Sequence, residues 1–378
     1  MFDYHYYNII HYYKHIYIFV KYIIILLSII FLSMFSIINS ANSNSLYESD
    51  FIKIEIKTNN AYETKLKSIE EIKNKSLLVI VDKILDDSNK RKFIKLLNEN
   101  NFINELVQNI IIENEIITNQ KYIAEIRVNF DKKRIINILR NYKINYSDNI
   151  PFTYLVISSY NQEFINIGLE RNNIFFNKFK NNIFTNNYLL NYIFPILDPN
   201  DRYILSYDKM ITEDKNAYRK LLDKYNIDQA LYIKINHTKN KINFLIKSFD
   251  KNINQFIQIK QFEYNFDQNN NIDFINSLSE DILHELDDWW KKENQINNSI
   301  INSIKCTIKS ANFDDFYFIK STINNLSQVL TIKPIQFKIN NNIEMIKYYG
   351  DTDMFSKSLY LKGITLEYSD YCVISSNL

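Results

Sequence analysis

Hydrophobic and polar residues follow two different periods along the first third of the chain. Residues 51–57 have isoleucine at every second position from Ile52, which predicts a half-buried β-strand. From residue 61 to residue 86 apolar side chains recur every three or four positions, which predicts a long amphipathic helix. Two β-branched segments, 106–117 and 122–130, then flank a short polar turn. We therefore expect a strand, a helix and a β-hairpin in this order.

A second helix and a fourth strand complete the N-terminal pattern. Asp131 precedes an apolar helical stripe, and its carboxylate can accept hydrogen bonds from the N–H groups of the first turn. Residues 152–158 are apolar and are expected to return as a strand. The order β-α-β-β-α-β is that of a split βαβ, ferredoxin-like unit, which we assign to a domain of residues 44–159.

The middle region, residues 160–299, has the pattern of an α/β domain. An amphipathic stretch surrounds Phe175 and Phe179, and a Pro-bounded segment follows it. A helix is predicted at 213–225, and another opens near residue 269. Between these helices lie three apolar strands separated by polar turns, which predict an antiparallel meander, at 229–235, 242–249 and 256–266.

The C-terminal part, residues 300–378, repeats the order β-α-β-β-α-β. Pro334 falls in the second of its strands. In the usual sheet order of this unit, 4-1-3-2, the second strand is an edge, where a residue without an N–H group is tolerated. The fold class is therefore predicted as α+β, with two split βαβ units flanking an α/β middle region.

The composition excludes several classes of protein. The chain of 378 residues has a net charge of +2 and only 3 Gly, so neither a strongly basic nucleic-acid binder nor a glycine-rich phosphate loop is expected. The 2 Cys and 5 His leave few metal ligands. No hydrolase, zinc-protease, redox or nucleotide motif is found, so we assign no catalytic, metal or cofactor-binding residues.

An uncharged apolar run at residues 22–38 predicts membrane targeting. Lys14 and Lys21 precede the run and the first charge after it is Glu48, so the N-terminus is expected in the cytoplasm and the rest outside. Residues 41–43 offer a small-x-small cleavage site, which favours a signal peptide over residues 1–43. The run also reaches the lower limit for a spanning helix, so an uncleaved N-terminal anchor stays open.

The histidines and tryptophans of the exported part have structural interpretations. His237 lies in a predicted hairpin turn and His284 on the polar side of a helix, so we expect both at the surface. Neither has an identifiable partner for general-base catalysis. Trp289 is predicted to end a buried helical stripe that Trp290 flanks.

Paired carboxylates are also interpreted as structural. Adjacent helical residues point in different directions, so Asp287 and Asp288 are not expected to share a site. Two further pairs lie in or just before the first turn of a predicted helix, where negative charge complements the helix dipole. These pairs are Asp314 with Asp315 and Asp351 with Asp353.

Cys306 and Cys372 could form a disulfide. Each cysteine shares its strand face with apolar residues, and the two strands are neighbours in the 4-1-3-2 order. An exported protein meets an oxidising environment. The register between the strands decides between a disulfide and two separate buried thiols, and the sequence leaves both open.

Several segments resemble domain of unknown function 2066, a proteobacterial envelope family. The match rests on IRVNFD at 126–131, PFTYLVI at 151–157, LDPND at 197–201, KYNIDQAL at 224–231 and YYGD at 348–351. Asn226 and Ile227 depart from the family pattern, in which a glycine and a small residue occupy these places. The resemblance covers most of the exported part, implies a secreted or anchored envelope protein and carries over no catalytic residues.

From these observations we expect an exported cell-envelope protein, periplasmic or anchored facing the periplasm, that acts as a non-catalytic binding or assembly factor. Its expected partner is another envelope protein, with membrane contact through the N-terminal segment if that segment is uncleaved. Exposed strand edges are the expected partner surface. An envelope hydrolase using acidic residues and a membrane-anchored structural subunit are the alternatives.

Overall fold

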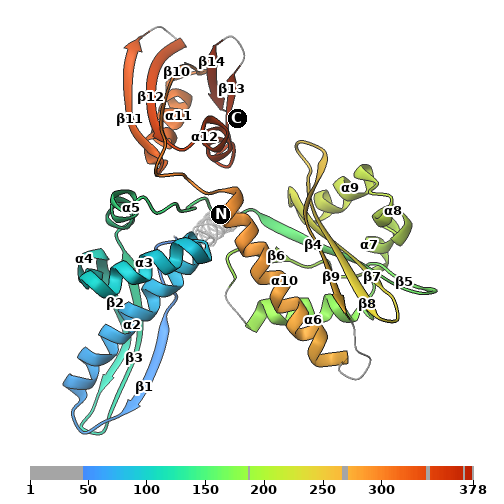
Figure 1. Ribbon diagram of the computed structural model, residues 1–378, viewed down its shortest axis with the longest axis horizontal. Helices are drawn as coiled ribbons and strands as arrows, with labels where there is room; N and C mark the ends of the chain where they lie inside the picture. The colour runs from blue at the N-terminus through green and yellow to red at the C-terminus, as the bar shows by residue number, and fades with distance from the viewer. Residues whose placement is uncertain (1–45, 186–187, 266–270, 338–340, 369–370, 377–378) are drawn as a thin grey trace, which may run out of the picture. The chain divides into compact units, whose positions relative to one another are not determined.

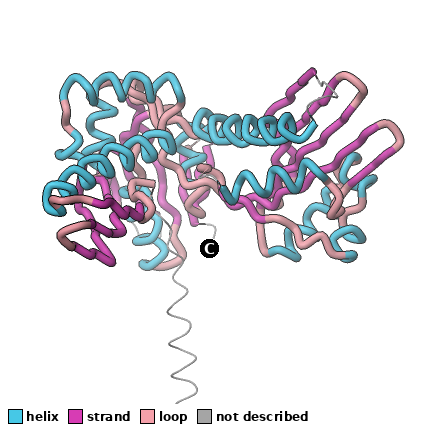
Figure 2. The backbone as a smooth tube through the Cα atoms, turned by 90° about the horizontal axis from the view of Figure 1, so that it is seen from below, coloured by secondary structure: helices cyan, strands magenta, loops and turns pink. Residues whose placement is uncertain are grey.

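The computed structural model describes residues 46–185, 188–265, 271–337, 341–368 and 371–376. Helices pack with three separate sheets made of antiparallel and mixed strands, which confirms the α+β class. Figure 2 shows the helices running alongside the strands of these sheets. The predicted targeting segment, residues 22–38, lies outside the described residues. Within the described ranges, no helix is both long enough and apolar enough to cross a membrane.

The first sheet has three antiparallel strands in the order β1-β3-β2. Alternate residues of β3 from Tyr122 to Phe130 are buried and pack against α2, as the period-two pattern predicts. Asp131 caps α5 by accepting hydrogen bonds from the N–H groups of Lys133 and Arg134. The elements are β1 (Ile52–Lys57), α2 (Ala61–Ile84), α3 (Asp87–Asn100), α4 (Ile103–Leu106), β2 (Val107–Ile117), β3 (Lys121–Phe130) and α5 (Lys132–Asn141).

The assignment of the next strand to this first sheet was wrong. The strand β4 (Thr153–Gln162) pairs with β7 of the middle sheet, and the boundary predicted between residues 159 and 160 falls inside it. The reason is burial: side chains 154–159 are buried on both faces, which is typical of a strand in a sheet covered by helices on both sides.

The middle sheet has the order β5-β4-β7-β8-β9, with β6 also pairing with β4. Helices α6 and α10 pack on one face, and helices α7 to α9 lie towards the other (Figure 1). The predicted antiparallel meander of β7, β8 and β9 is confirmed. The elements are β5 (Ile165–Ile167), α6 (Ile174–Thr185), β6 (Asn191–Ile193), α7 (Pro199–Ile204), α8 (Tyr207–Ile211), α9 (Lys215–Tyr225), β7 (Gln229–His237), β8 (Lys241–Asp250), β9 (Gln255–Asn265) and α10 (Asn271–Glu293).

The third sheet has the order β11-β12-β10-β14-β13, which corresponds to the predicted 4-1-3-2 order. The predicted fourth strand is a hairpin of two strands, β13 and β14, and β14 lies parallel to β10. Pro334 lies in the edge strand β11, as predicted. The elements are β10 (Ile301–Lys309), α11 (Phe313–Asn325), β11 (Val329–Gln336), β12 (Asn341–Tyr349), α12 (Thr352–Tyr360), β13 (Ile364–Tyr368) and β14 (Cys372–Ser376).

Trp290 joins the end of α10 to the segment that follows α5. Its side chain is 2% exposed and its indole N–H donates to the carbonyl oxygen of Asn149 at 3.2 Å. Trp289 is only partly buried, so the predicted roles of the two tryptophans are reversed. A step of four residues from Leu286 reaches Trp290, and a step of three reaches Trp289, so the helical period alone does not separate them.

The cysteines face each other in the third sheet. Cys306 of β10 lies opposite Cys372 of β14 in the register, their Cα atoms are 4.5 Å apart, and the sulfurs are bonded as a disulfide. Both side chains belong to the core of this sheet.

We expect the double variant Cys306→Ala/Cys372→Ala to unfold at lower temperature than the parent chain. Removing a cross-link that closes a long loop typically costs about 2–4 kcal/mol of unfolding free energy. Thermal unfolding with and without a thiol reductant measures this. The reductant should lower the midpoint of the parent chain and leave that of the double variant unchanged; two alkylatable thiols in the native protein would contradict the disulfide.

Candidate binding site in the middle sheet

A cavity lies at the carboxyl ends of β4 and β7. The two strands run parallel, with Gln162 opposite His237 at the last pair of the register. In open α/β sheets, ligands commonly bind beyond the carboxyl ends of parallel strands. The cavity forms here because β4 continues into the hairpin with β5 while α6 and α10 cover the same face of the sheet.

The wall of the cavity is mostly apolar. Its volume is about 210 Å³. For comparison, an engineered apolar cavity of about 150 Å³ in another protein binds benzene, so this cavity has room for a single ring or a branched aliphatic group. The lining residues are Tyr160, Gln162, Ile165, Ile167, Asn172, Ile174, Phe175, Ile235, His237, Ile242, Phe244, Ile275 and Leu278.

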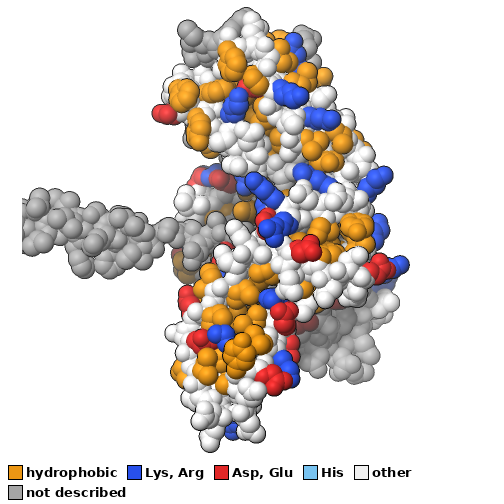
Figure 3. Space-filling model, turned by 90° about the vertical axis from the view of Figure 1, so that its left-hand side faces the viewer, with side chains coloured by type: hydrophobic (Ala, Val, Ile, Leu, Met, Phe, Trp, Pro, Cys, Tyr) orange, Lys and Arg blue, Asp and Glu red, His pale blue; other side chains and the backbone are white. Residues whose placement is uncertain are grey.

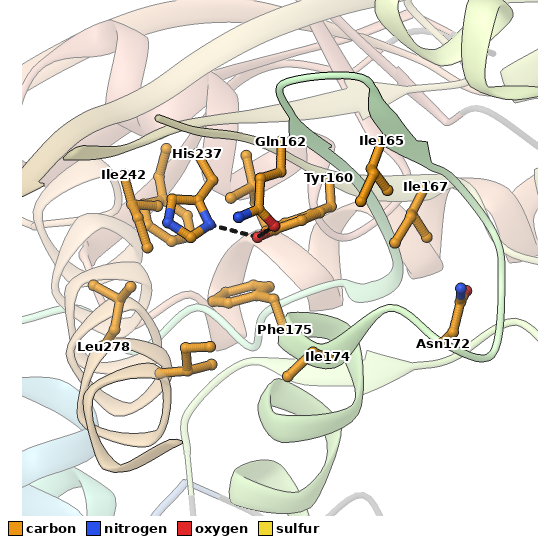
Figure 4. Close-up of a pocket in the computed structure, with 13 residues that line it drawn as sticks. Tyr160, Gln162, Ile165, Ile167, Asn172, Ile174, Phe175, His237, Ile242 and Leu278 are labelled. Carbon is orange, nitrogen blue, oxygen red and sulfur yellow. Dashed lines mark hydrogen bonds between the residues drawn. The ribbon is translucent and has the colours of Figure 1, made fainter. Parts of the chain in front are cut away.

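Three polar side chains form one side of the cavity (Figure 4). The hydroxyl of Tyr160 is hydrogen-bonded to Nδ1 of His237 at 2.5 Å and lies 3.0 Å from the side-chain oxygen of Gln162. The three residues point to the same face because they occupy alternate positions of β4 and the paired end of β7. The phenol and the imidazole therefore orient each other.

His237 is 8% exposed, so its predicted place at the surface was wrong. The strand β7 extends to His237, and the polar turn begins only at the next residue. Leu231, Ile233 and Ile235 have the same parity in the strand and share its face. This parity is the signal in the sequence that could have placed the imidazole inside. His284, by contrast, is exposed on α10, as predicted.

Burial keeps the polar groups of the cavity uncharged. Desolvation lowers the pKa of His237 below its usual value, and the carboxylate of Glu163 opposes that shift. Burial also raises the pKa of the Tyr160 hydroxyl. At neutral pH the cavity therefore offers neutral hydrogen-bonding groups, which suit a ligand that is itself uncharged inside the cavity.

The mouth of the cavity carries exposed apolar side chains. Ile165 and Ile174, which line the cavity, are 56% and 62% exposed. Phe164, at the tip of the hairpin between β4 and β5, is 97% exposed. Hydrophobic side chains also gather among charged ones elsewhere on the surface (Figure 3). The exposed side chains at the mouth extend the apolar wall of the cavity to the surface, which is the arrangement of a binding site.

The paired carboxylates have the structural roles that were predicted. Asp287 accepts hydrogen bonds from the backbone N–H groups of Leu189 and Leu190, whereas Asp288 pairs with Lys291 at 2.6 Å. Burial raises the pKa of Asp287 to about 6. The remaining pairs lie at helix starts: Asp315 is in the first turn of α11, and Asp351 caps α12 by accepting from the N–H of Met354 at 2.7 Å.

Two segments on which the family resemblance rests meet on the other face of the middle sheet. Lys224 contacts Asp198 at 2.9 Å and Asp201 at 2.7 Å, and the hydroxyl of Tyr225 donates to Asp201 at 2.7 Å. These contacts with Asp201 and Asp198 raise the pKa of Lys224. Asp201 is fully buried and its second oxygen also accepts from the N–H of Leu197. The network fixes the loop before α7, which is a structural role.

We expect the variant His237→Asn to change how stability depends on pH. Because the pKa of His237 is lower in the folded chain, its stabilising effect is complete above the unfolded value near 6.5 and is lost as the pH falls toward the folded value. The parent chain should therefore lose more stability than His237→Asn between pH 7 and pH 5, measured by urea unfolding. The carboxyl of Asp287, whose pKa is raised, stabilises both folded chains as the pH falls. Taking the difference between the two curves of stability against pH cancels this shared contribution.

The control is the same comparison between pH 7 and pH 8, above the unfolded pKa of histidine, where the stability of the two chains should change equally. If His237→Asn also matched the parent chain between pH 7 and pH 5, the buried neutral imidazole would be excluded.

Comparison with known proteins gives little. No family model and no curated protein sequence matches the chain. Among solved structures, the C-terminal domain of LpoB from Salmonella enterica aligns with a TM-score of 0.22 at 10% identity, over 36% of this chain and 95% of that domain. A TM-score this low carries no argument for fold or function. The resemblance to domain of unknown function 2066 thus stays a prediction.

Proposed function

We propose that the chain is an exported cell-envelope protein that binds another envelope protein without catalysing a reaction on it. The observation that carries the proposal is the apolar cavity at the carboxyl ends of β4 and β7, with its neutral polar side and its exposed apolar mouth. A surface of this kind suits an apolar anchor side chain of a partner, which is the usual energetic centre of a protein interface.

Export is supported by the sequence. The apolar run at residues 22–38, with basic residues before it, directs the described part of the chain across a membrane. The resemblance to the envelope family points in the same direction. We accordingly propose a periplasmic location, either free after cleavage or held by the uncleaved segment.

The edge of the middle sheet supports a protein partner. The strand β5 pairs with β4 on one side, and no described strand pairs with its other side. Ile165 and Ile167 of β5 both line the cavity. An extended segment added along β5 would form backbone hydrogen bonds and place alternate side chains over the cavity.

The hydrolase alternative, which would use acidic residues such as Asp351 and Asp353, is supported less well. Asp351 is engaged as a helix cap. The polar groups at the cavity are a neutral phenol, an imidazole and two amides, which suit recognition of a neutral group.

We expect a photo-reactive benzoylphenylalanine at position 164 to form one discrete covalent adduct in the native envelope. The side chain of Phe164 is almost fully exposed beside the cavity, so the substitution should leave the fold intact. Adding Leu278→Trp, which fills the cavity from α10, should reduce the adduct at least about tenfold, as expected for loss of an anchor contact worth ~2 kcal/mol.

The matched control is the same reagent at position 313, an exposed phenylalanine of α11 outside the middle sheet. It should give no such adduct. An identical adduct from both positions, or one that survives in a folded Leu278→Trp chain, would contradict the proposed site.

A further inference from the structure

A second hollow adjoins the cavity and has a different chemistry. Asn172 lines both. The hollow lies where the segment before α6 meets the start of α7, and it is open to solvent. Its lining residues are Glu170, Arg171, Asn172, Leu197, Pro199 and Arg202.

The hollow is positively charged. Arg171 and Arg202 are both exposed, and Glu170 is the single acidic residue of its lining. In the described part of the chain, neither guanidinium belongs to an ion pair, in contrast to Lys224 nearby, which is held between two carboxylates. A guanidinium binds a carboxylate through two parallel hydrogen bonds, so two arginines with one opposing charge favour an anion.

We propose that the site binds the C-terminal residue of a partner protein, with its apolar side chain in the cavity and its carboxylate at Arg171 and Arg202. The inference rests on the proposed function and adds which part of the partner is bound. A C-terminal residue joins one apolar group and one carboxylate through a single carbon atom, which matches an apolar cavity and a cationic hollow that share a wall residue.

The edge strand β5 can bind the partner residues that precede the C-terminal one. Residues preceding the C-terminus can lie extended along β5, whose outer edge is not paired with a described strand. The cavity of about 210 Å³ has room for one aromatic or branched side chain and not for a long acyl chain. Size therefore favours a peptide terminus over a fatty acid.

The test compares two fluorescein-labelled six-residue peptides of glycine and serine that end in phenylalanine, one with a free carboxylate and one amidated. The full chain, held in lipid nanodiscs, should bind the free acid roughly ten- to a hundredfold more tightly in fluorescence anisotropy, since the amide cannot form the charged contact. Adding octanoate as a competitor tests whether the ligand is a fatty acid instead of a peptide C-terminus.

Variants assign the effect to the hollow. Arg171→Gln and Arg202→Gln should each weaken binding of the free acid about tenfold and leave binding of the amide unchanged. Arg219→Gln is the matched control, because Arg219 is an exposed arginine of α9 that lines neither hollow. The affinity of the Arg219→Gln variant for both peptides should equal that of the parent chain.

Equal affinity for the acid and the amide would overturn the inference while the cavity remained a binding site. Octanoate binding without any peptide binding would overturn it in favour of a fatty acid. Failure of the adduct at position 164 would instead refute the proposed function, so the two failures are distinguishable.

Discussion

The parallel pairing of β4 with β7 is the constraint on which the rest of the middle sheet depends. It joins residues 154–162 to residues 229–237 across a long stretch of chain, and it is buried on both faces by two separate hydrophobic clusters. Each cluster needs alternate side chains of the same two strands. A shift of one residue in this register would move the side chains of the shifted strand from one cluster into the other, where they do not fit. The packing of the two clusters therefore fixes the register and with it the position of the side chains at the strand ends.

The same pairing creates the candidate site. Because the strands end together, Gln162 and His237 lie opposite each other, and the hydroxyl of Tyr160 reaches the imidazole at 2.5 Å. The apolar helices α6 and α10 then close the space from one side. Desolvation keeps the imidazole and the phenol neutral, so the cavity selects an uncharged group while the adjoining arginines attract an anion. A C-terminal residue would satisfy both at once, with its apolar side chain in the cavity and its carboxylate in the hollow at Arg171 and Arg202.

Local pattern predicted most elements of this fold, and long-range pairing accounts for what it missed. Period and capping located the longer helices, the hairpin of β2 and β3, the meander of β7 to β9 and the edge strand with Pro334, but not the short helices α4, α7 and α8. The sheet to which β4 belongs was not predictable from its neighbours along the chain. Its uninterrupted apolar run was nevertheless a signal for a strand covered on both faces. The site was missed for the same reason: Tyr160 and His237 meet only through the β4–β7 register, and Arg171 and Arg202 are ordinary surface residues until loops bring them together.

The most direct test is methyl NMR of the isoleucine-labelled full chain titrated with the free-acid peptide. Six isoleucines line the cavity, namely Ile165, Ile167, Ile174, Ile235, Ile242 and Ile275. Their methyl signals should shift together with one dissociation constant, while Ile319 and Ile323, buried in the core of the third sheet, stay in place. Shifts confined to other surfaces, or none among the cavity isoleucines at saturation, would contradict the account.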